Sequence, residues 1–195
     1  MGRAGKGGEA NAAHIIAKSP VAREYIALER EPLKRPDPLE DLQDLINSLW
    51  RKTGLGGCVT VSPTRSDDGS PHIEHHGDKY DIVITERGSE RKRIPGLSLP
   101  VAARWFVFGM AARHSQSSEL RDRRTLGDAP LLAGGLKDDG YSRWNWMAPT
   151  IALMRQISPT FGDWAAQEYA QTLLEYPLSE SETRNARYPF SADSQ

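Results

Sequence analysis

The stretch LSLPVAARWFVFGMAARHS, residues 97–115, decides the fold. It is the longest apolar run of the chain, but at about 12 consecutive mostly apolar residues it is too short to span a membrane. Ser98 belongs to the residue types that cap helix starts, and Pro100 falls where a proline in the first turn is tolerated. Apolar side chains then recur at helical spacing, at Val101, Trp105 and Phe108. Because a helix that is apolar on almost every side has to be buried, we expect this helix at the centre of the domain.

A second helix is predicted over residues 37–50. Asp37 suits the capping position, Pro38 the first turn, and Gly54 a stop after the last turn. Its apolar residues form one stripe: Leu39, Leu42, Ile46, Leu49 and Trp50. Such a stripe predicts a helix that packs one face against a core.

Between these two helices the pattern changes to alternation. Strands are predicted at residues 58–62 (CVTVS), 71–76 (PHIEHH), 79–85 (KYDIVIT) and 90–94 (ERKRI), with turns between them. An antiparallel meander of three or four strands has one face available to the central helix. Helix, meander and further helices together predict the α+β class.

The remaining chain completes the predicted organisation. Residues 116–145 are poorly patterned and contain glycine breakers, and short helices are predicted at 148–157 and 163–176. We expect a disordered arm at 1–18, one α+β domain over 19–178 that begins with a short helix at 20–31, and a disordered polar tail at 179–195. The chain of 195 residues is long enough to bury a sizeable core.

Composition points to a cytoplasmic protein. The basic residues near the start are followed by an alanine-rich polar stretch and not by the apolar core of a signal peptide. The single cysteine, Cys58, cannot form an internal disulfide, in keeping with a reducing compartment. Within an apolar strand it is expected to be a small buried side chain and not a nucleophile.

The net charge of −1 hides an uneven distribution. Residues 37–85 carry nine acidic and four basic side chains, whereas residues 86–124 carry four acidic and nine basic ones. Alternating charge suits docking onto another charged protein surface, and it also suits an ordinary solvated surface. It differs from the continuous basic stripe of a nucleic-acid-binding protein.

Histidines and a glutamate cluster in HIEHH. His72, Glu74 and His76 would share one face of a strand, and three such groups can ligate zinc. No partner motif occurs elsewhere, so we favour exposed histidines and expect no metal, no cofactor and no catalytic residues. A metal-dependent hydrolase built on this motif is the least favoured function.

The segment DDGYSRWNW, residues 138–146, is the predicted partner-binding site. Trp, Tyr and Arg dominate binding hot spots, and here they are flanked by acidic residues: Asp138, Asp139, Tyr141, Arg143, Trp144 and Trp146. If the segment is extended, both tryptophan rings lie on one side. The alternative is that the rings fold back onto the core, because large aromatic side chains are buried on average.

Two groups of basic residues, at 91–93 and 121–124, leave a second function open. They can contact phosphates, which would make the chain a nucleic-acid-associated or phage regulatory protein that uses segment 86–124. No aromatic residues interleave with them as a single-strand platform requires. A solvated, partly ion-paired surface is the favoured interpretation.

The middle of the chain resembles a known family. A helix that ends in Trp50 and Gly54 leads to a strand, to GDKYDIVITERGSE (77–90) and to LSLPVAARWFVFGMAAR (97–113). This order and spacing, over roughly residues 40–115, is similar to small cytoplasmic immunity proteins of bacterial polymorphic-toxin systems, of the type paired with NAD glycohydrolases of the tuberculosis-necrotizing-toxin kind. The resemblance implies a non-catalytic protein that binds a cognate toxin domain and inhibits it.

Overall fold

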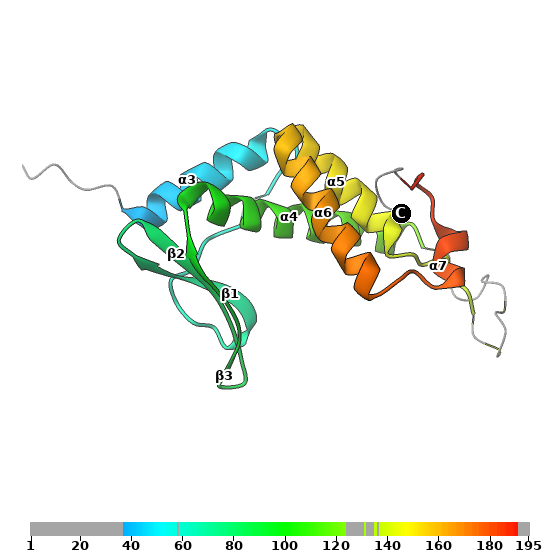
Figure 1. Ribbon diagram of the computed structural model, residues 1–195, viewed down its shortest axis with the longest axis horizontal. Coiled ribbons are helices and arrows are strands. Elements are labelled where there is room, and N and C mark those ends of the chain that lie inside the picture. The colour runs from blue at the N-terminus through cyan, green and yellow to red at the C-terminus, as the bar shows by residue number, and fades with distance from the viewer. Residues whose placement is uncertain (1–36, 58, 124–130, 132–134, 136, 191–195) are drawn as a thin grey trace, which may run out of the picture. The chain divides into compact units, whose positions relative to one another are not determined.

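The computed structural model describes residues 37–57, 59–123, 131, 135 and 137–190 (Figure 1). The predicted arm at 1–18, the helix at 20–31 and Cys58 lie outside these residues. A compact unit begins at Pro38. Its elements, in chain order, are α3 (Pro38–Arg51), β1 (Asp68–His76), β2 (Lys79–Glu86), β3 (Ser89–Leu97), α4 (Leu99–Arg121), α5 (Trp144–Ile157), α6 (Pro159–Glu175) and α7 (Glu180–Asn185).

Helix α4 is the axis of this unit, as its sequence predicts. It packs against α3, α5 and β2, and Figure 1 shows α3 and the sheet along its first half and α5 and α6 beyond them. Apolar side chains along α4 are buried in the common core: Ala102, Ala103, Phe106, Val107, Met110 and Ala111. Because helices and an antiparallel sheet share this core, the predicted α+β class is confirmed.

The ends of α4 differ in detail from the prediction. Ser98 occupies the capping position and Pro100 the first turn, but the Ser98 side chain makes no capping hydrogen bond. The helix also continues beyond residue 115 to Arg121, so it takes up the first part of the segment predicted to be irregular. Its last turns bury the polar residues Ser115 and Glu119, whose burial no apolar pattern announces.

The sheet has three antiparallel strands in the order β1-β2-β3. Ile73, Ile82 and Ile94 are paired across it, and Ile73 and Ile82 are buried in the core that α4 shares. His72, Val83 and Arg93 are paired in the same way on the opposite face, because side chains alternate along a strand. We call this second face the outer face of the sheet.

The predicted strand at 58–62 is wrong for the residues that the structure describes, 59–62, which form no strand. The Gln43 side chain of α3 takes the place of a neighbouring strand: its Nε2 donates to the Val59 carbonyl at 2.8 Å, and its Oε1 accepts from the Val61 amide at 2.8 Å. The Ser62 carbonyl accepts the Ile73 amide at 2.8 Å. The Val59 carbonyl and the Val61 amide, which would pair with a neighbouring strand in a sheet, are thus hydrogen-bonded to a side chain instead.

Helix α5 begins at Trp144, four residues before the predicted start, and Pro149 lies inside it. The segment 144–146 is therefore helical and not extended, so the two tryptophan rings do not share a side. α5 packs against α6, where Gly162 lies so close to Arg155 that a Cβ on the glycine would be 2.6 Å from the Arg155 Cβ.

The predicted disorder from residue 179 does not hold for residues 179–190. Ser179 and Glu182 form a reciprocal capping box at the start of α7: the Glu182 amide donates to Ser179 Oγ, and Glu182 accepts from the Ser179 amide. The predicted domain end at 178 therefore moves to at least residue 190, and residues 191–195 lie outside the description.

None of the helices in the described ranges is long and apolar enough to cross a membrane.

Candidate partner-binding surface and polar cluster of the sheet

The acidic part of the predicted partner-binding site is a turn held by its own carboxylates. Asp138 Oδ1 accepts the Gly140 amide and Asp139 Oδ1 accepts the Tyr141 amide, each at 3.0 Å. Asp138 Oδ1 also accepts the Asn185 side-chain amide at 2.6 Å. These contacts fix the turn against the C-terminal segment and leave the side chains of Asp138, Asp139 and Tyr141 half-buried.

Arg123 joins this turn to the end of α4. Its guanidinium pairs with the buried Glu119 carboxylate at 2.9 Å and with Asp139 at 3.4 Å, and it lies 4.4 Å from the centre of the Tyr141 ring. The hydrogen bond to Glu119 raises the pKa of Arg123, so the arginine stays charged. A buried glutamate is stabilised here because it has a charged partner.

Arg143 ties the start of α5 to the C-terminal segment. Its Nε donates to Glu182 Oε1 at 2.7 Å, and its terminal nitrogens donate to the carbonyls of Tyr176 and Pro177 at 2.9 and 2.6 Å. The hydrogen bond from Arg143 lowers the pKa of Glu182 to about 2 against the cost of burial. The arginine therefore holds its own chain together and has few donors left for a partner.

The two tryptophans are both packed against the chain. Trp144 is 3% exposed, donates its Nε1 hydrogen to the Tyr188 carbonyl at 3.1 Å, and stacks on the Phe190 ring with centroids 5.2 Å apart. Trp146 is half-buried and meets the Tyr169 ring of α6 edge-on at 5.6 Å. Trp144 as a direct partner contact would require residues 188–190 to move away, and so this contact stays a prediction.

Asn145, which the sequence analysis did not single out, is the third anchor of the C-terminal segment. Its Nδ2 donates to the Asn185 carbonyl at 3.0 Å and its Oδ1 accepts the Arg187 amide at 2.7 Å. The six predicted site residues therefore do lie in one region, but most of their polar contacts hold residues 176–190.

A surface that sequence reasoning missed lies at the same end of the molecule. Five large apolar side chains in these segments are exposed, with exposed fractions from 39% to 76%: Leu120, Leu174, Tyr176, Tyr188 and Phe190. We call these five residues the apolar end surface. The sequence placed Tyr176 at the end of the helix predicted at 163–176, yet Tyr176 follows the last residue of α6 and is 64% exposed.

Two contacts bring the segments of this surface together. Arg187 pairs at 3.5 Å with Asp122, which is two residues after Leu120, and Arg143 donates to the Tyr176 carbonyl. Figure 1 shows α7 at the end of the helical layer where α6 finishes and α5 begins. A groove of about 630 Å³ is lined by residues of α5, among them Trp144, by residues of α6 and by Pro189.

A second cluster lies on the outer face of the sheet. His72, Glu74 and His76 share this face, as alternation predicts, and Asp81 is paired with Glu74 on the neighbouring strand. His72 is 4% exposed, with its Nε2 3.6 Å from Glu74 Oε1. The expectation that the histidines of this motif are exposed is therefore wrong for His72, although His75 and His76 are exposed.

Arg93 connects the carboxylates of this cluster. It lies 2.7 Å from Glu74, 2.9 Å from Asp81 and 2.9 Å from Glu90. Its hydrogen bonds lower the pKa of Glu74 and of Glu90. The pKa of Asp81 is lowered mainly by the hydrogen bond from the Gly96 amide and to a smaller extent by the one from Arg93. These three carboxylates are ionised at neutral pH.

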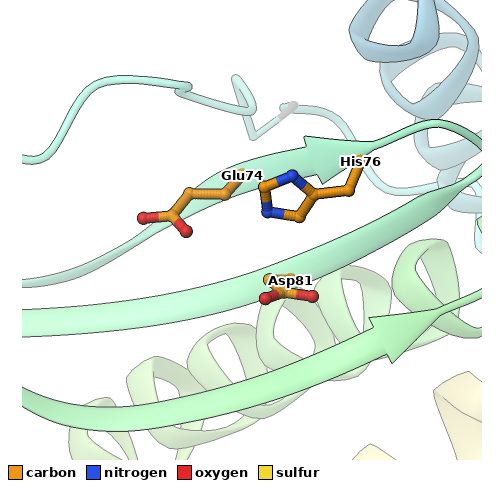
Figure 2. A group of neighbouring side chains, drawn as sticks. All are labelled: Glu74, His76 and Asp81. Atoms are coloured by element: carbon orange, nitrogen blue, oxygen red, sulfur yellow. The ribbon is translucent and has the colours of Figure 1, made fainter.

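The side chains nearest to a metal-ligand arrangement differ from the predicted set. Glu74, His76 and Asp81, shown in Figure 2, each offer a donor atom within 4.8 Å of the others, and His72 is not one of the three.

The basic segment 86–124 does not form one stripe in the residues that the structure describes. Arg93 lies on the sheet with three acidic partners, Arg91 is 3.4 Å from Glu86, and Arg123 lies at the far end of α4 with Glu119. Arg124 lies outside the described residues. Nucleic-acid binding through this segment stays an untested alternative.

No family model, curated protein or solved structure matches this chain.

Proposed function

We propose that the chain is a non-catalytic protein-binding module, an immunity protein that binds and inhibits a cognate bacterial toxin in the cytoplasm. The proposal starts from the resemblance of residues 40–115 to immunity proteins. The observation that carries it is the apolar end surface, whose large apolar side chains are exposed on segments that contact the predicted partner-binding site: Arg143 and Trp144 bind the carbonyls of Tyr176 and Tyr188, and Arg123, three residues after Leu120, binds Asp139. Exposed apolar groups that gather in one place, with polar groups around them, are typical of protein interaction sites.

The size and composition of this region suit an interface. A fully covered aromatic side chain buries about 150–250 Å², and Tyr176, Tyr188 and Phe190 are 64%, 44% and 39% exposed, so about half of that area is open to a partner. The residues around them would supply the larger part of the roughly 800 Å² per partner of a standard interface. Tyrosine is enriched at such sites because its ring is apolar and its hydroxyl still bonds to a partner or to water. Asp138 and Asp139 lie next to this surface and would belong to the polar rim, where charge raises the association rate.

Co-purification followed by a neutralisation assay tests the proposal. The tagged chain is expressed in the organism that encodes it, and bound proteins are identified by mass spectrometry. The expected partner has a domain that arrests growth when expressed alone and is neutralised when this chain is co-expressed. Recovery with nucleic acid, or a partner that is not toxic, would contradict the proposal.

Two substitutions locate the interface. Leu174→Lys places a charge on an exposed apolar residue in the last turn of α6, where a cation is favoured by the helix dipole, so the fold is retained. We expect it to weaken toxin binding by tenfold or more. Ser48→Lys is the matched control, because Ser48 is exposed on α3, away from the apolar end surface. Equal affinities for the two variants would move the interface elsewhere.

A further inference from the structure

The register of β1 and β2 brings three metal-ligand side chains together on the outer face of the sheet. Glu74 lies directly opposite Asp81, and His76 follows Glu74 by two residues on the same strand and face. One donor atom from each side chain lies within 4.8 Å of the donor atoms of the other two. Figure 2 shows the three side chains. Ligand atoms about 2.1 Å from one zinc ion lie roughly 3–4 Å apart, so small side-chain rotations complete the arrangement.

The charge of the cluster favours a cation. Three carboxylates, those of Glu74, Asp81 and Glu90, surround the guanidinium of Arg93. Lys79, opposite His76 on the same face, lies 3.7 Å from a further carboxylate, that of Asp78, so around the three ligand side chains four carboxylates face two cations and leave an excess of negative charge. A divalent ion bound to two of the carboxylates removes this excess.

A buried imidazole stands behind the first ligand. His72 is 4% exposed, its Nε2 lies 3.6 Å from Glu74 Oε1, and its Nδ1 has no hydrogen-bond partner among the residues that the structure describes. A buried polar atom without a partner is uncommon, and polar groups next to a metal-binding carboxylate help to orient it. His72 thus supplies an observation independent of the three ligands.

Arg93 competes with an ion for the same two carboxylates, but it has an alternative partner. Its Nε and Nη2 donate to the two oxygens of Glu90 at 3.0 and 2.9 Å, while its Nη1 reaches Glu74 and Asp81. The guanidinium is planar and rigid, so Nη1 can leave Glu74 and Asp81 only if the whole group swings away, which also breaks the 3.5 Å contact of Nη2 with Glu74. The exposed side chain of Glu90 can move with the arginine and keep the two-point pairing. The arginine therefore sets the strength of metal binding without blocking it.

We propose that Glu74, His76 and Asp81 bind a divalent transition-metal ion, with zinc preferred, in competition with the guanidinium of Arg93. An imidazole with two carboxylates suits Zn²⁺ or Co²⁺ better than Mg²⁺ or Ca²⁺, which take oxygen ligands. The three ligands leave a coordination position for water or for a donor from another molecule. This site lies on the sheet and does not depend on the proposed inhibition of a toxin.

The test uses the full chain without a histidine tag, freed of metal by a chelator. Zn²⁺ is titrated by calorimetry, and Co²⁺ is titrated by its visible absorption, which reports nitrogen and oxygen ligation directly. We expect one ion per chain, displacement of Co²⁺ by Zn²⁺, and a tenfold or greater loss of affinity for His76→Ala. His75→Ala is the matched control, since the neighbouring histidine lies on the other face of the same strand.

Arg93→Gln gives the prediction that is specific to this mechanism. Removal of the competing cation should tighten Zn²⁺ binding severalfold, whereas a merely structural arginine would leave the affinity unchanged or lower it. Circular dichroism of each variant serves as the control for folding. The proposal is overturned if the wild-type chain binds no stoichiometric Zn²⁺ below about 1 mM, if His75→Ala and His76→Ala lose affinity equally, or if Arg93→Gln does not tighten binding.

Discussion

Two glycine-to-alanine substitutions in two helices should change stability in opposite directions. Gly162 is a buried residue of α6, and its new Cβ would lie 2.6 Å from Arg155 Cβ and 2.9 Å from Arg155 Cα on α5. Gly109 is the matched control inside α4, where, of the residues that the structure describes, a Cβ would meet only the Arg113 guanidinium at 3.7 Å. The chemical change is the same at both positions, and only the packing differs.

The magnitudes follow from two terms. Alanine is favoured over glycine in a helix interior by about 0.5–1 kcal/mol, and Gly109→Ala gains this without a clash. At Gly162 the nearest atoms are backbone and Cβ, which cannot rotate away, so α5 and α6 have to move apart. Overpacking of this kind costs about 1–3 kcal/mol, which exceeds the gain in helix propensity. We expect a net loss of about 1–2 kcal/mol for Gly162→Ala.

Urea unfolding followed by circular dichroism measures the difference. With a slope of about 2 kcal/mol per molar urea, the midpoints of the two variants should differ by about 1 M. A Gly162→Ala midpoint at or above that of the wild type would show that α5 and α6 do not approach as closely as described. Equal losses in both variants would show that alanine is unfavourable for another reason.

Two further predictions concern the C-terminal segment. Because the Arg143 hydrogen bond holds the pKa of Glu182 at about 2, below its ordinary value of 4.5, the ion pair stabilises the fold above about pH 5 and is lost as the pH falls toward 2. Glu182→Gln should therefore flatten the fall in unfolding free energy over that interval, measured by urea titrations at a series of pH values; an unchanged slope would contradict the pairing. Asn145→Ala removes two hydrogen bonds to residues 185 and 187, worth about 1–3 kcal/mol with the groups left unpaired, and should speed tryptic cleavage near Arg187. Asn47→Ala, which loses one hydrogen bond within α3, is the control and should leave that cleavage unchanged.

Local patterns were sufficient for α3, α4 and the three strands. The apolar stripe that ends at Trp50 and the alternation at residues 79–85 each describe one element and its buried face without reference to other parts of the chain. The strands proved longer than predicted because polar residues such as Asp68 and Ser89 also pair in the ladder.

Long-range contacts explain the elements that were mispredicted. The stretch 59–62 alternates like a strand, but the Gln43 side chain meets its backbone, and no local pattern reveals a partner 16 or more residues away. Pro149 suggested a helix start, because proline is common in a first turn. The earlier start at Trp144 is stabilised by contacts with residues 188–190, which the polar composition of the tail had assigned to disorder.

Residues that form binding hot spots and residues that hold a chain together are of the same types, so the sequence of the predicted site did not distinguish the two roles. Trp, Tyr and Arg are the residues that anchor a partner, and they anchor a chain's own segments for the same reasons. In DDGYSRWNW the arginine and one tryptophan hold residues 176–190, so the contacts of these two side chains in the structure are internal, and binding of another protein by this segment stays a prediction.

Because Arg143, Trp144 and Asn145 already bind residues 176–190, a partner that competes for them pays an energetic cost. A partner that contacted Trp144 directly would first have to displace residues 176–190, with the bonds of Arg143, Trp144 and Asn145. At about 1 kcal/mol for each of several hydrogen bonds, the affinity would fall by about a thousandfold or more. A partner that binds Tyr176, Tyr188 and Phe190 on the outside of the docked segment loses none of these bonds. Binding energy therefore favours the apolar end surface over the tryptophan beneath it.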